Sequence, residues 1–237
     1  MSNTLFCEKL RTTEDAIQWI KHGDRVLVGG FGLCGTPFTL IDTIAESDHA
    51  RELTIISNNL GEAGKGLGKL LISKHIKKAV GSYFTSNRDA VKAWKSGDLE
   101  IELIPQGTLA EAIRAGGAGI AGFYTKTAVG TKLAEGKEER VFDGERFIFV
   151  RGIKADVALI KAFKADTLGN LIYSKTARNF NPMMATAANL VIAEVDEIVE
   201  AGTLEPEQIV TPHAYIDFIV LNERYKKVGG VYVERNR

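Results

Sequence analysis

The chain has 237 residues, of which 45% are hydrophobic and 25% are charged, as in an ordinary globular protein. Its 30 basic and 30 acidic residues balance, so neither nucleic acid nor an anionic membrane is expected as a partner. Cys7 and Cys34 are too few for a disulfide framework, and no apolar run has the length of a signal-peptide core or a bilayer span, which together favour a cytoplasmic protein.

The predicted elements begin with a capped helix from Thr12 to Ile20, which Gly23 ends. Strands are then expected near 25–29, 53–57, 78–82 and 100–104, and helices near 37–47, 66–74, 87–95 and 108–115. Strands that alternate with helices are typical of βαβ units. The first half of the chain therefore predicts a mainly parallel sheet with helices on both faces.

Glycine is most frequent from Ala115 to Gly122, and no regular periodicity follows until about Val141. This segment is predicted to be a long loop, of the kind that is usually functional or disordered. Runs rich in β-forming residues resume at 146–151, 156–162, 190–195 and 216–221. Because no internal repeat or low-complexity linker divides the chain, residues 1–237 are predicted to form a single α/β domain.

The most informative segment is the glycine-rich turn that follows the apolar run Val26-Leu27-Val28. Thr36 can cap the next helix and Pro37 can lie in its first turn, so the turn is expected to aim free N–H groups at an anion. The segment from Gly30 to Gly35 also fits the dinucleotide pattern GxGxxG. However, the second strand ends in amides rather than in the acidic residue that holds a ribose, which disfavours NAD. A tight turn without a ligand is the remaining alternative.

Three strand ends carry polar groups that suit a ligand site. Asn58 and Asn59 follow the second strand, and Gln106 follows the fourth. Ligands of open parallel sheets bind beyond the carboxyl ends of the strands, and neutral amides there suit a thioester oxyanion or an acyl carboxylate. The alternative is that these three side chains only cap turns and helices.

Other polar residues have simpler explanations. Glu62 is expected to be a solvated loop carboxylate, and Glu111 a first-turn charge favoured by the helix dipole. Lys65 and Lys69 lie in a glycine-rich stretch that resembles a phosphate cradle but fails the P-loop pattern, and surface lysines near loops are commoner than phosphate ligands. Cys34 is expected to be a small buried thiol inside the turn. No metal site is predicted, because the histidines are scattered; they are His22, His49, His75 and His213.

Several motifs, in order along nearly the whole chain, resemble those of the α subunit of the family I coenzyme A transferases. The first is Gly29-Gly30-Phe31 followed by Gly35 and Pro37 after three apolar residues. The others are Ser57-Asn58-Asn59, Pro105 to Glu111, Arg114 to Gly119, Phe123-Tyr124-Thr125, Lys164-Ala165-Asp166, Gly169-Asn170 and Ala177 to Asn181. The chain is most similar to the succinyl-CoA:3-ketoacid and acetate/acetoacetate transferases.

This resemblance implies an open, mainly parallel α/β sheet flanked by helices, the NagB/RpiA-like architecture, and a role in ketone-body or fatty-acid metabolism. It implies a ping-pong reaction through a glutamyl-CoA intermediate, with CoA as a substrate and no permanently bound cofactor. The nucleophilic glutamate is expected on a partner, the β subunit, in an αβ or α2β2 assembly, since Asn58 stands where that glutamate would be. The partners are then the β subunit, together with an acyl-CoA and a short-chain carboxylate.

The resemblance also assigns site residues. Asn58 and Gln106 are expected to orient the substrate, and the loop from Gly116 to Gly130 to line the acyl pocket. The residues expected to approach CoA are Gly29, Gly30, Phe31, Gly32, Leu33, Cys34 and Gly35. Two alternatives stay open, a sugar-phosphate isomerase-like enzyme and an acyl-CoA-binding module without catalysis.

Overall fold

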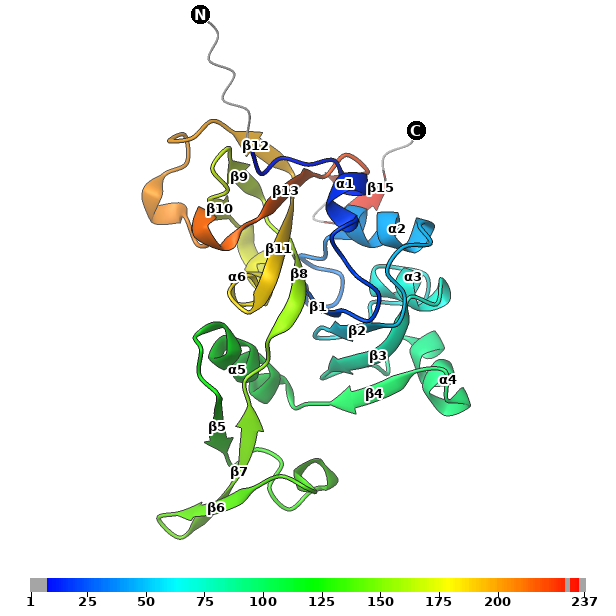
Figure 1. Cartoon of the computed structure of the whole chain (residues 1–237), viewed down its shortest axis with the longest axis vertical. Coiled ribbons are helices and arrows are strands. Elements are labelled where there is room, and N and C mark those ends of the chain that lie inside the picture. The colour runs from blue at the N-terminus through cyan, green and yellow to red at the C-terminus, as the bar shows by residue number, and fades with distance from the viewer. Residues whose placement is uncertain (1–7, 229–230, 235–237) are drawn as a thin grey trace, which may run out of the picture.

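The computed structural model describes residues 8–228 and 231–234, so Cys7 lies outside the described residues. Its central feature is a seven-stranded sheet in the order β13-β11-β8-β1-β2-β3-β4, in which all neighbouring strands are parallel (Figure 1). The strands are β1 (Arg25–Val28), β2 (Leu53–Ile56), β3 (Ile76–Gly81), β4 (Glu100–Leu103), β8 (Ala155–Lys161), β11 (Ala188–Val195) and β13 (Phe218–Leu221). The predicted parallel α/β sheet is therefore confirmed.

Helices cover both faces of this sheet (Figure 1). Four of them, α1 to α4, pack on one face, and α5 and α6 pack on the other. Their bounds are α1 (Thr13–Ile17), α2 (Phe38–Glu46), α3 (Leu67–Ile72), α4 (Arg88–Ser96), α5 (Gln106–Gly117) and α6 (Asn181–Ala185).

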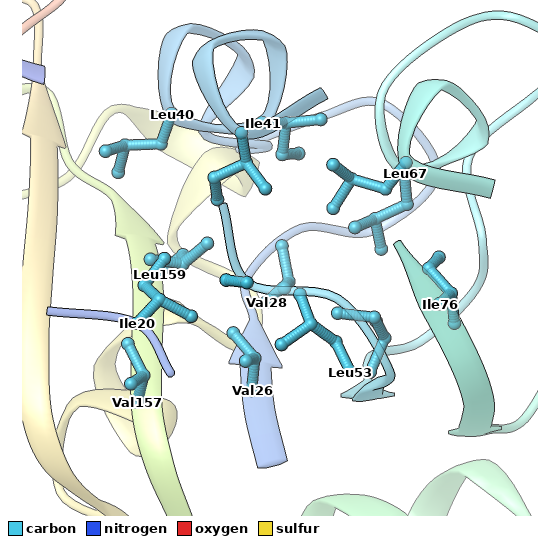
Figure 2. Close-up of a cluster of buried hydrophobic side chains, with 14 of the residues drawn as sticks. Ile20, Val26, Val28, Leu40, Ile41, Leu53, Leu67, Ile76, Val157 and Leu159 are labelled. Atoms are coloured by element: carbon cyan, nitrogen blue, oxygen red, sulfur yellow. The ribbon is translucent and has the colours of Figure 1, made fainter. Parts of the chain in front are cut away.

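The alternation of side chains along β1 explains the two-layered core. Val26 and Val28 belong to the cluster beneath α1 to α4, whereas Leu27 belongs to the cluster beneath α5 and α6. Figure 2 shows Val26 and Val28 on the side of the sheet that faces Leu40 and Ile41 of α2. Because both faces of the strand are buried, its sequence is a continuous apolar run rather than an alternating one.

The predicted long loop after α5 is wrong near both of its ends, whereas its middle holds only a short 3-10 turn. It contains β5 (Gly122–Thr125) and β6 (Glu139–Phe142), which pair antiparallel with β7 (Glu145–Arg151) to form an arm that projects from the sheet (Figure 1). Phe142 pairs with Glu145, and Asp143 and Gly144 between them have φ values of 48° and 78°. An Asp-Gly pair with positive φ at both positions is the turn that closes a two-residue hairpin.

Two smaller sheets complete the described fold. One has the order β10 (Leu171–Ile172), β9 (Lys164–Asp166) and β12 (Glu197–Val199), and the other is the antiparallel pair of β14 (Tyr225–Val228) and β15 (Val231–Glu234). Short 3-10 turns occur at Lys132–Ala134, Lys175–Arg178, Pro206–Gln208 and His213–Tyr215. Among the residues that the structure describes, no helix combines the length and the apolar character needed to cross a bilayer.

Two helix starts test the capping predictions. Thr12 precedes α1, and its hydroxyl accepts the N–H of Asp15 at 3.1 Å, although the helix ends at Ile17, three residues earlier than expected. The predicted cap of α2 is wrong, because its N-cap is Pro37 and the cap position makes no side-chain hydrogen bond. Thr36 instead packs against Gly30, leaving α2 without a local cap.

Candidate functional site

The predicted polar residues meet beyond the carboxyl ends of β1 to β4. The glycine turn follows β1, Asn58 follows β2, Ser82 follows β3 and Gln106 begins α5 after β4. In the sheet, β2 lies on one side of β1 and β8 lies on the other. The strand order therefore reverses beside β1, and the carboxyl end of β1 is part of this edge. A pocket of about 430 Å³ lies there, lined among others by Phe31, Gly32, Asn58, Asn59, Glu62, Ser82, Tyr83 and Gln106.

Asn58 is at the centre of this pocket's hydrogen bonds. Its Nδ2 donates to Oγ of Ser82 and to Oε1 of Gln106, both at 3.1 Å, and its Oδ1 accepts Nδ2 of Asn59 at 3.1 Å. The Asn58 side chain is buried, whereas Gln106 is exposed. Because the oxygen of Gln106 is turned toward Asn58, the NH₂ group of Gln106 remains the donor that can meet a ligand oxygen.

Asn59 has a different local role. Its Oδ1 accepts the N–H of Gly61 at 2.7 Å, which is an Asx-type turn two residues on, and its Nδ2 donates to Asn58. The expectation that an amide here shapes a turn is therefore confirmed for Asn59. The NH₂ group of Asn58 instead donates to Ser82, which follows β3, and to Gln106 in α5.

The glycine turn is a tight hairpin-like loop. Phe31 and Cys34 exchange backbone hydrogen bonds of 3.0 and 3.1 Å, which places Gly32 and Leu33 at its tip. Phe31 is 49% exposed and lines the pocket. The predicted burial of Cys34 is wrong, because its side chain is exposed and lies 3.6 Å from Oγ1 of Thr176, at the outer surface of the turn.

Asn181, at the start of α6, holds the base of the turn. Its Oδ1 accepts the N–H of Lys161 at 2.9 Å, and its Nδ2 donates to the carbonyls of Gly35 and Ala177 at 3.0 and 2.9 Å. A Cβ added to Gly29 would lie 1.7 Å from Oδ1 of Asn181, so only glycine fits there. Asn179 adds a bond of 3.0 Å from Nδ2 to the carbonyl of Cys34.

Sequence reasoning does not find these two asparagines as site residues. The motif from Ala177 to Asn181 marks the segment in the sequence, but residue type alone does not indicate that its amides reach the glycine turn 145 and 146 positions earlier. The contact arises because α6 packs on the sheet beside β1 and β8.

Of the other charged residues considered from the sequence, only Glu62 lines the pocket. Glu62 is an exposed loop carboxylate as expected, 3.8 Å from Nζ of Lys65, and it also lines the pocket. Glu111 is not in the first turn of α5; it pairs with Arg114, whose hydrogen bond lowers the pKa of the Glu111 carboxyl. Lys69 is occupied by Asp42, with Nζ 2.8 Å from Oδ2, rather than free for a phosphate.

The segment from Gly116 to Gly130, expected to line the acyl pocket, lies elsewhere in this chain. No residue from Gly116 to Gly130 lines the pocket, because that segment forms the end of α5 and the start of the arm. Within the described residues, no three His, Cys, Asp or Glu side chains come together in a way that could hold a metal ion. The residues that line the pocket thus carry side-chain amides, hydroxyls and the carboxylate of Glu62.

The sequence matches the family model described as coenzyme A transferase over residues 10–222, which include every predicted site residue. The chain belongs to the coenzyme A transferase family. It is 52% identical over 218 residues to a Bacillus subtilis protein named as one of the subunits of a probable succinyl-CoA:3-ketoacid coenzyme A transferase, covering 92% of this chain and 91% of that one. It is 43% identical to the alpha chain of the acetate CoA-transferase of Escherichia coli K12, covering 92% and 99%.

The fold of this coenzyme A transferase chain also matches solved structures. An acyl-CoA transferase from Escherichia coli O157:H7, solved as a thioester complex with CoA, superposes with a TM-score of 0.82 at 20% identity. The match covers 96% of this chain and 52% of the other. At that identity the likeness establishes the fold, and the chain corresponds to about half of the larger protein.

Proposed function

We propose that this chain is the α subunit of a coenzyme A transferase that moves CoA between a short-chain acyl-CoA, such as succinyl-CoA or acetyl-CoA, and a 3-oxoacid or short-chain fatty acid. The names of the relatives in Bacillus subtilis and Escherichia coli support this, since both describe one subunit of such an enzyme. The observation that carries the proposal is the pocket in which Asn58 and Gln106 are joined at the carboxyl ends of β2 and β4.

The reaction proceeds by a covalent relay. A glutamate carboxylate attacks the thioester carbonyl, the carbon–sulfur bond breaks, and a mixed anhydride and the CoA thiolate form. The thiolate then attacks the glutamyl carbonyl of the anhydride, which releases the first acid and leaves a glutamyl-CoA thioester. The second acid repeats these steps in reverse and departs as its CoA ester.

The nucleophile belongs to a β subunit in this proposal. The position after β2 that the resemblance pairs with the nucleophile holds Asn58, and an amide is a poor nucleophile. The 52% coverage of the larger transferase and the subunit names of the relatives also support a second chain. The partner's glutamate would enter the pocket from the open side, past Phe31 and Tyr83, which are 49% and 56% exposed.

Asn58 and Gln106 supply neutral donors in this site. The NH₂ group of Gln106 meets the oxygen of the acyl group or the carboxylate, and the bond from Asn58 fixes the direction in which that group points. Preorganised donors aimed at an oxyanion lower the barrier to acyl transfer without moving a proton. The glycine turn from Gly29 to Gly35 allows the CoA to approach the backbone closely.

The test is to co-express this chain with a candidate β subunit, then to measure CoA exchange between succinyl-CoA and acetoacetate, with each chain alone as a control. Activity only in the mixture is expected. Intact-mass spectrometry after incubation with succinyl-CoA alone should then find the CoA adduct on the partner. An adduct on this chain would overturn the assignment, and Glu62→Gln would show whether Glu62 carries it.

Acetate and butyrate as acceptors extend the assay, because pockets discriminate single methylenes by only about 10- to 200-fold. A stable complex that transfers CoA to none of these acids would contradict the proposed substrate class. Binding of acyl-CoA by this chain without any complex would favour the acyl-CoA-binding module instead.

A further inference from the structure

A network of charged groups, with Glu194 and Lys161 buried, links the ends of β8 and β11 to the start of α2. Glu194 in β11 is completely buried, and Lys161 at the end of β8 is 1% exposed. Nζ of Lys161 lies 3.8 Å from Oε1 of Glu194 and 2.6 Å from Oδ1 of Asp196. Buried charges are costly unless they are paired and hydrogen-bonded, so the partners of Glu194 determine what this carboxylate can do.

The Glu194 carboxylate reaches the start of α2. Its Oε2 accepts the N–H of Leu40 at 3.1 Å, and Leu40 is the third residue of the helix. An ordinary N-cap side chain accepts the N–H of the second or third helical residue. Pro37, which holds the N-cap position, has no side-chain acceptor, and the first turn of α2 contains no acidic residue.

A second contact fixes the same turn of the helix. Oγ1 of Thr39 donates to Oδ1 of Asn222 at 2.9 Å, and Nδ2 of Asn222 donates to Oδ1 of Asp196 at 2.8 Å. Asp196 in turn accepts from Lys161. The first turn of α2 is therefore tied to β8, β11 and the segment after β13 through side chains that belong to a single network.

We infer that Glu194 is a positioning residue for the glycine turn, because its carboxylate replaces the missing N-cap of α2 and thereby fixes the end of the turn that leads into this helix. Gly35 is separated from the first residue of α2 only by Thr36 and Pro37. Asn181 holds the same turn from the other direction, through Lys161 N–H and the carbonyl of Gly35. The importance of this role for CoA binding rests on the proposed function.

The groups that face Glu194 determine how it responds to pH. Burial is the largest influence and raises the pKa of Glu194 to about 7. Lys161 and the N–H groups of Leu40 and Thr39 lower it, whereas Asp196 raises it. The charge of Glu194 also raises the pKa of Tyr225, whose hydroxyl donates a hydrogen bond to Asp42 of α2. Asp42 in turn forms an ion pair with Lys69 of α3.

The sign of the local effect follows from these contacts. Opening of the first turn of α2 alone leaves Glu194 buried and removes the N–H groups that lower its pKa. The open form then holds its proton more tightly than the closed form, so ionisation of Glu194 favours the closed form. The start of α2 and the glycine turn are expected to become more ordered as the pH rises above about 7, from the pKa of the closed form toward the higher pKa of the open form.

Hydrogen exchange on the full chain, assembled with its β subunit where one binds, tests this without relying on activity. Glu194→Gln keeps the size of the side chain and removes its charge, and Glu194→Asp keeps the charge but shortens its reach. At pH 8, where Glu194 is ionised, exchange in a peptide over residues 29–41 should rise about 2- to 30-fold in Glu194→Gln, the range for loss of a charge at a helix terminus. Exchange should also rise in Glu194→Asp, because the shorter side chain no longer brings its charge to the N–H of Leu40. In the wild type, exchange corrected for its intrinsic pH dependence should fall as the pH rises above about 7, and Glu194→Gln should lack this step.

Asp42→Asn is the matched control, because Asp42 is a buried carboxylate on the same helix that bonds to α3 instead of to free N–H groups. Its effect should appear in the peptide over residues 67–72 and should leave the pH step at 29–41 in place. Unchanged exchange at 29–41 in Glu194→Gln, or a pH step that persists in that variant, would overturn the inference.

The assembled enzyme supplies the second measurement. In Glu194→Gln, the KM for acyl-CoA should rise by a similar factor and lose its pH dependence near 7, with a smaller change in kcat. If exchange behaves as expected but no acid is a substrate, the proposed function fails while the positioning role of Glu194 stands. If the KM and its pH dependence are unchanged in an active enzyme, the positioning role in CoA binding is refuted.

Discussion

The Nδ2 atom of Asn58 lies 3.1 Å from Oε1 of Gln106, although the two residues are 48 positions apart in the sequence. Each follows a strand of the parallel sheet, and the order β2-β3-β4 brings the two strand ends to one edge with Ser82 between them. The bond orients the amide of Gln106, so the two side chains are expected to act as one unit in the pocket.

Substitution of these two residues should therefore be non-additive. Asn58→Ala and Gln106→Ala are each expected to lower kcat/KM of the assembled enzyme by about 10- to 100-fold, since each removes or misdirects a donor to the reacting group. The double variant should be little worse than the worse single variant, because Gln106 depends on Asn58 for its orientation. A double-mutant cycle on CoA exchange measures this coupling.

Gln208→Ala, at an exposed position in a 3-10 turn, is the control and should retain wild-type kcat/KM. If the effects of Asn58→Ala and Gln106→Ala multiply, the two amides act independently and the orienting role of Asn58 is refuted.

The close approach of Gly29 to Asn181 makes a second prediction. Gly29→Ala places a Cβ 1.7 Å from Oδ1 of Asn181 and should lower the free energy of unfolding by several kcal/mol, or displace the Asn181 side chain. Asn181→Ala loses the partner of Lys161 N–H and should cost about 1–3 kcal/mol. The double variant should be less destabilised than the sum, because the clash disappears with the amide.

Urea unfolding of all three variants measures the coupling. Gly107→Ala is the matched control, since no atom lies within 4 Å of its added Cβ and the residue is in α5, where alanine is favoured. Full additivity of Gly29→Ala and Asn181→Ala would mean that the two residues do not meet in solution.

The sequence is sufficient to predict the parallel sheet, because its strands and helices alternate with clear apolar runs. It does not reveal the arm, since the segment near Phe123 lacks a long apolar run; the pair Asp143-Gly144 is the local signal for its hairpin. The local sequence pattern assigns the N-cap of α2 to Thr36. It cannot show that the carboxylate of Glu194, from β11, accepts the N–H of Leu40 in place of a local cap.

The same distinction applies to the site. Asn58 and Gln106 can be selected because strand ends of a parallel sheet meet at one edge, which topology alone determines. Asn181 and Glu194 cannot, because their importance depends on burial and on contacts across more than 140 positions. Within the run Leu190 to Val195, a single glutamate has the pattern of a solvent-facing residue, yet it is completely buried.

His75 should make stability depend on pH. It is completely buried, its Nδ1 lies 2.7 Å from Oγ of Ser73, and its Nε2 lies 3.1 Å from the carbonyl of Ser47, as suits a neutral ring. Burial, followed by the charge of Arg51, lowers the pKa of His75 below its ordinary value of 6.5. The unfolded chain therefore binds this proton more readily, and stability is lost as the pH falls below 6.5.

Thermal or urea unfolding between pH 5 and 7 tests this expectation. The slope due to His75 should not exceed about 1.4 kcal/mol per pH unit, the limit for one proton. His75→Gln should be less stable at pH 7 but should lose less stability on acidification. An equal loss in both proteins would assign the acid sensitivity to other groups.

Glu194 should also make the free energy of global unfolding depend on pH, with a slope opposite in sign to that of His75. Its pKa is raised by burial from 4.5 to about 7 in the folded chain, so the folded state binds more protons than the unfolded state between these values. The contribution of Glu194 to stability is then present at low pH and is lost as the pH rises toward 7, on the order of 3 kcal/mol in all. His75 and Glu194 titrate over overlapping ranges, so the wild type should show a shallow net dependence between pH 5 and 7.

The single variants separate the two contributions. Glu194→Gln should gain stability relative to the wild type as the pH rises from 5 to 8. In this variant the contribution of Glu194 is absent, so the increase in stability with pH that comes from His75 is no longer offset. The combined variant with His75→Gln should be nearly independent of pH over this interval. If Glu194→Gln instead loses stability relative to the wild type as the pH rises, the attraction of Lys161 outweighs burial, and Glu194 is ionised throughout this range.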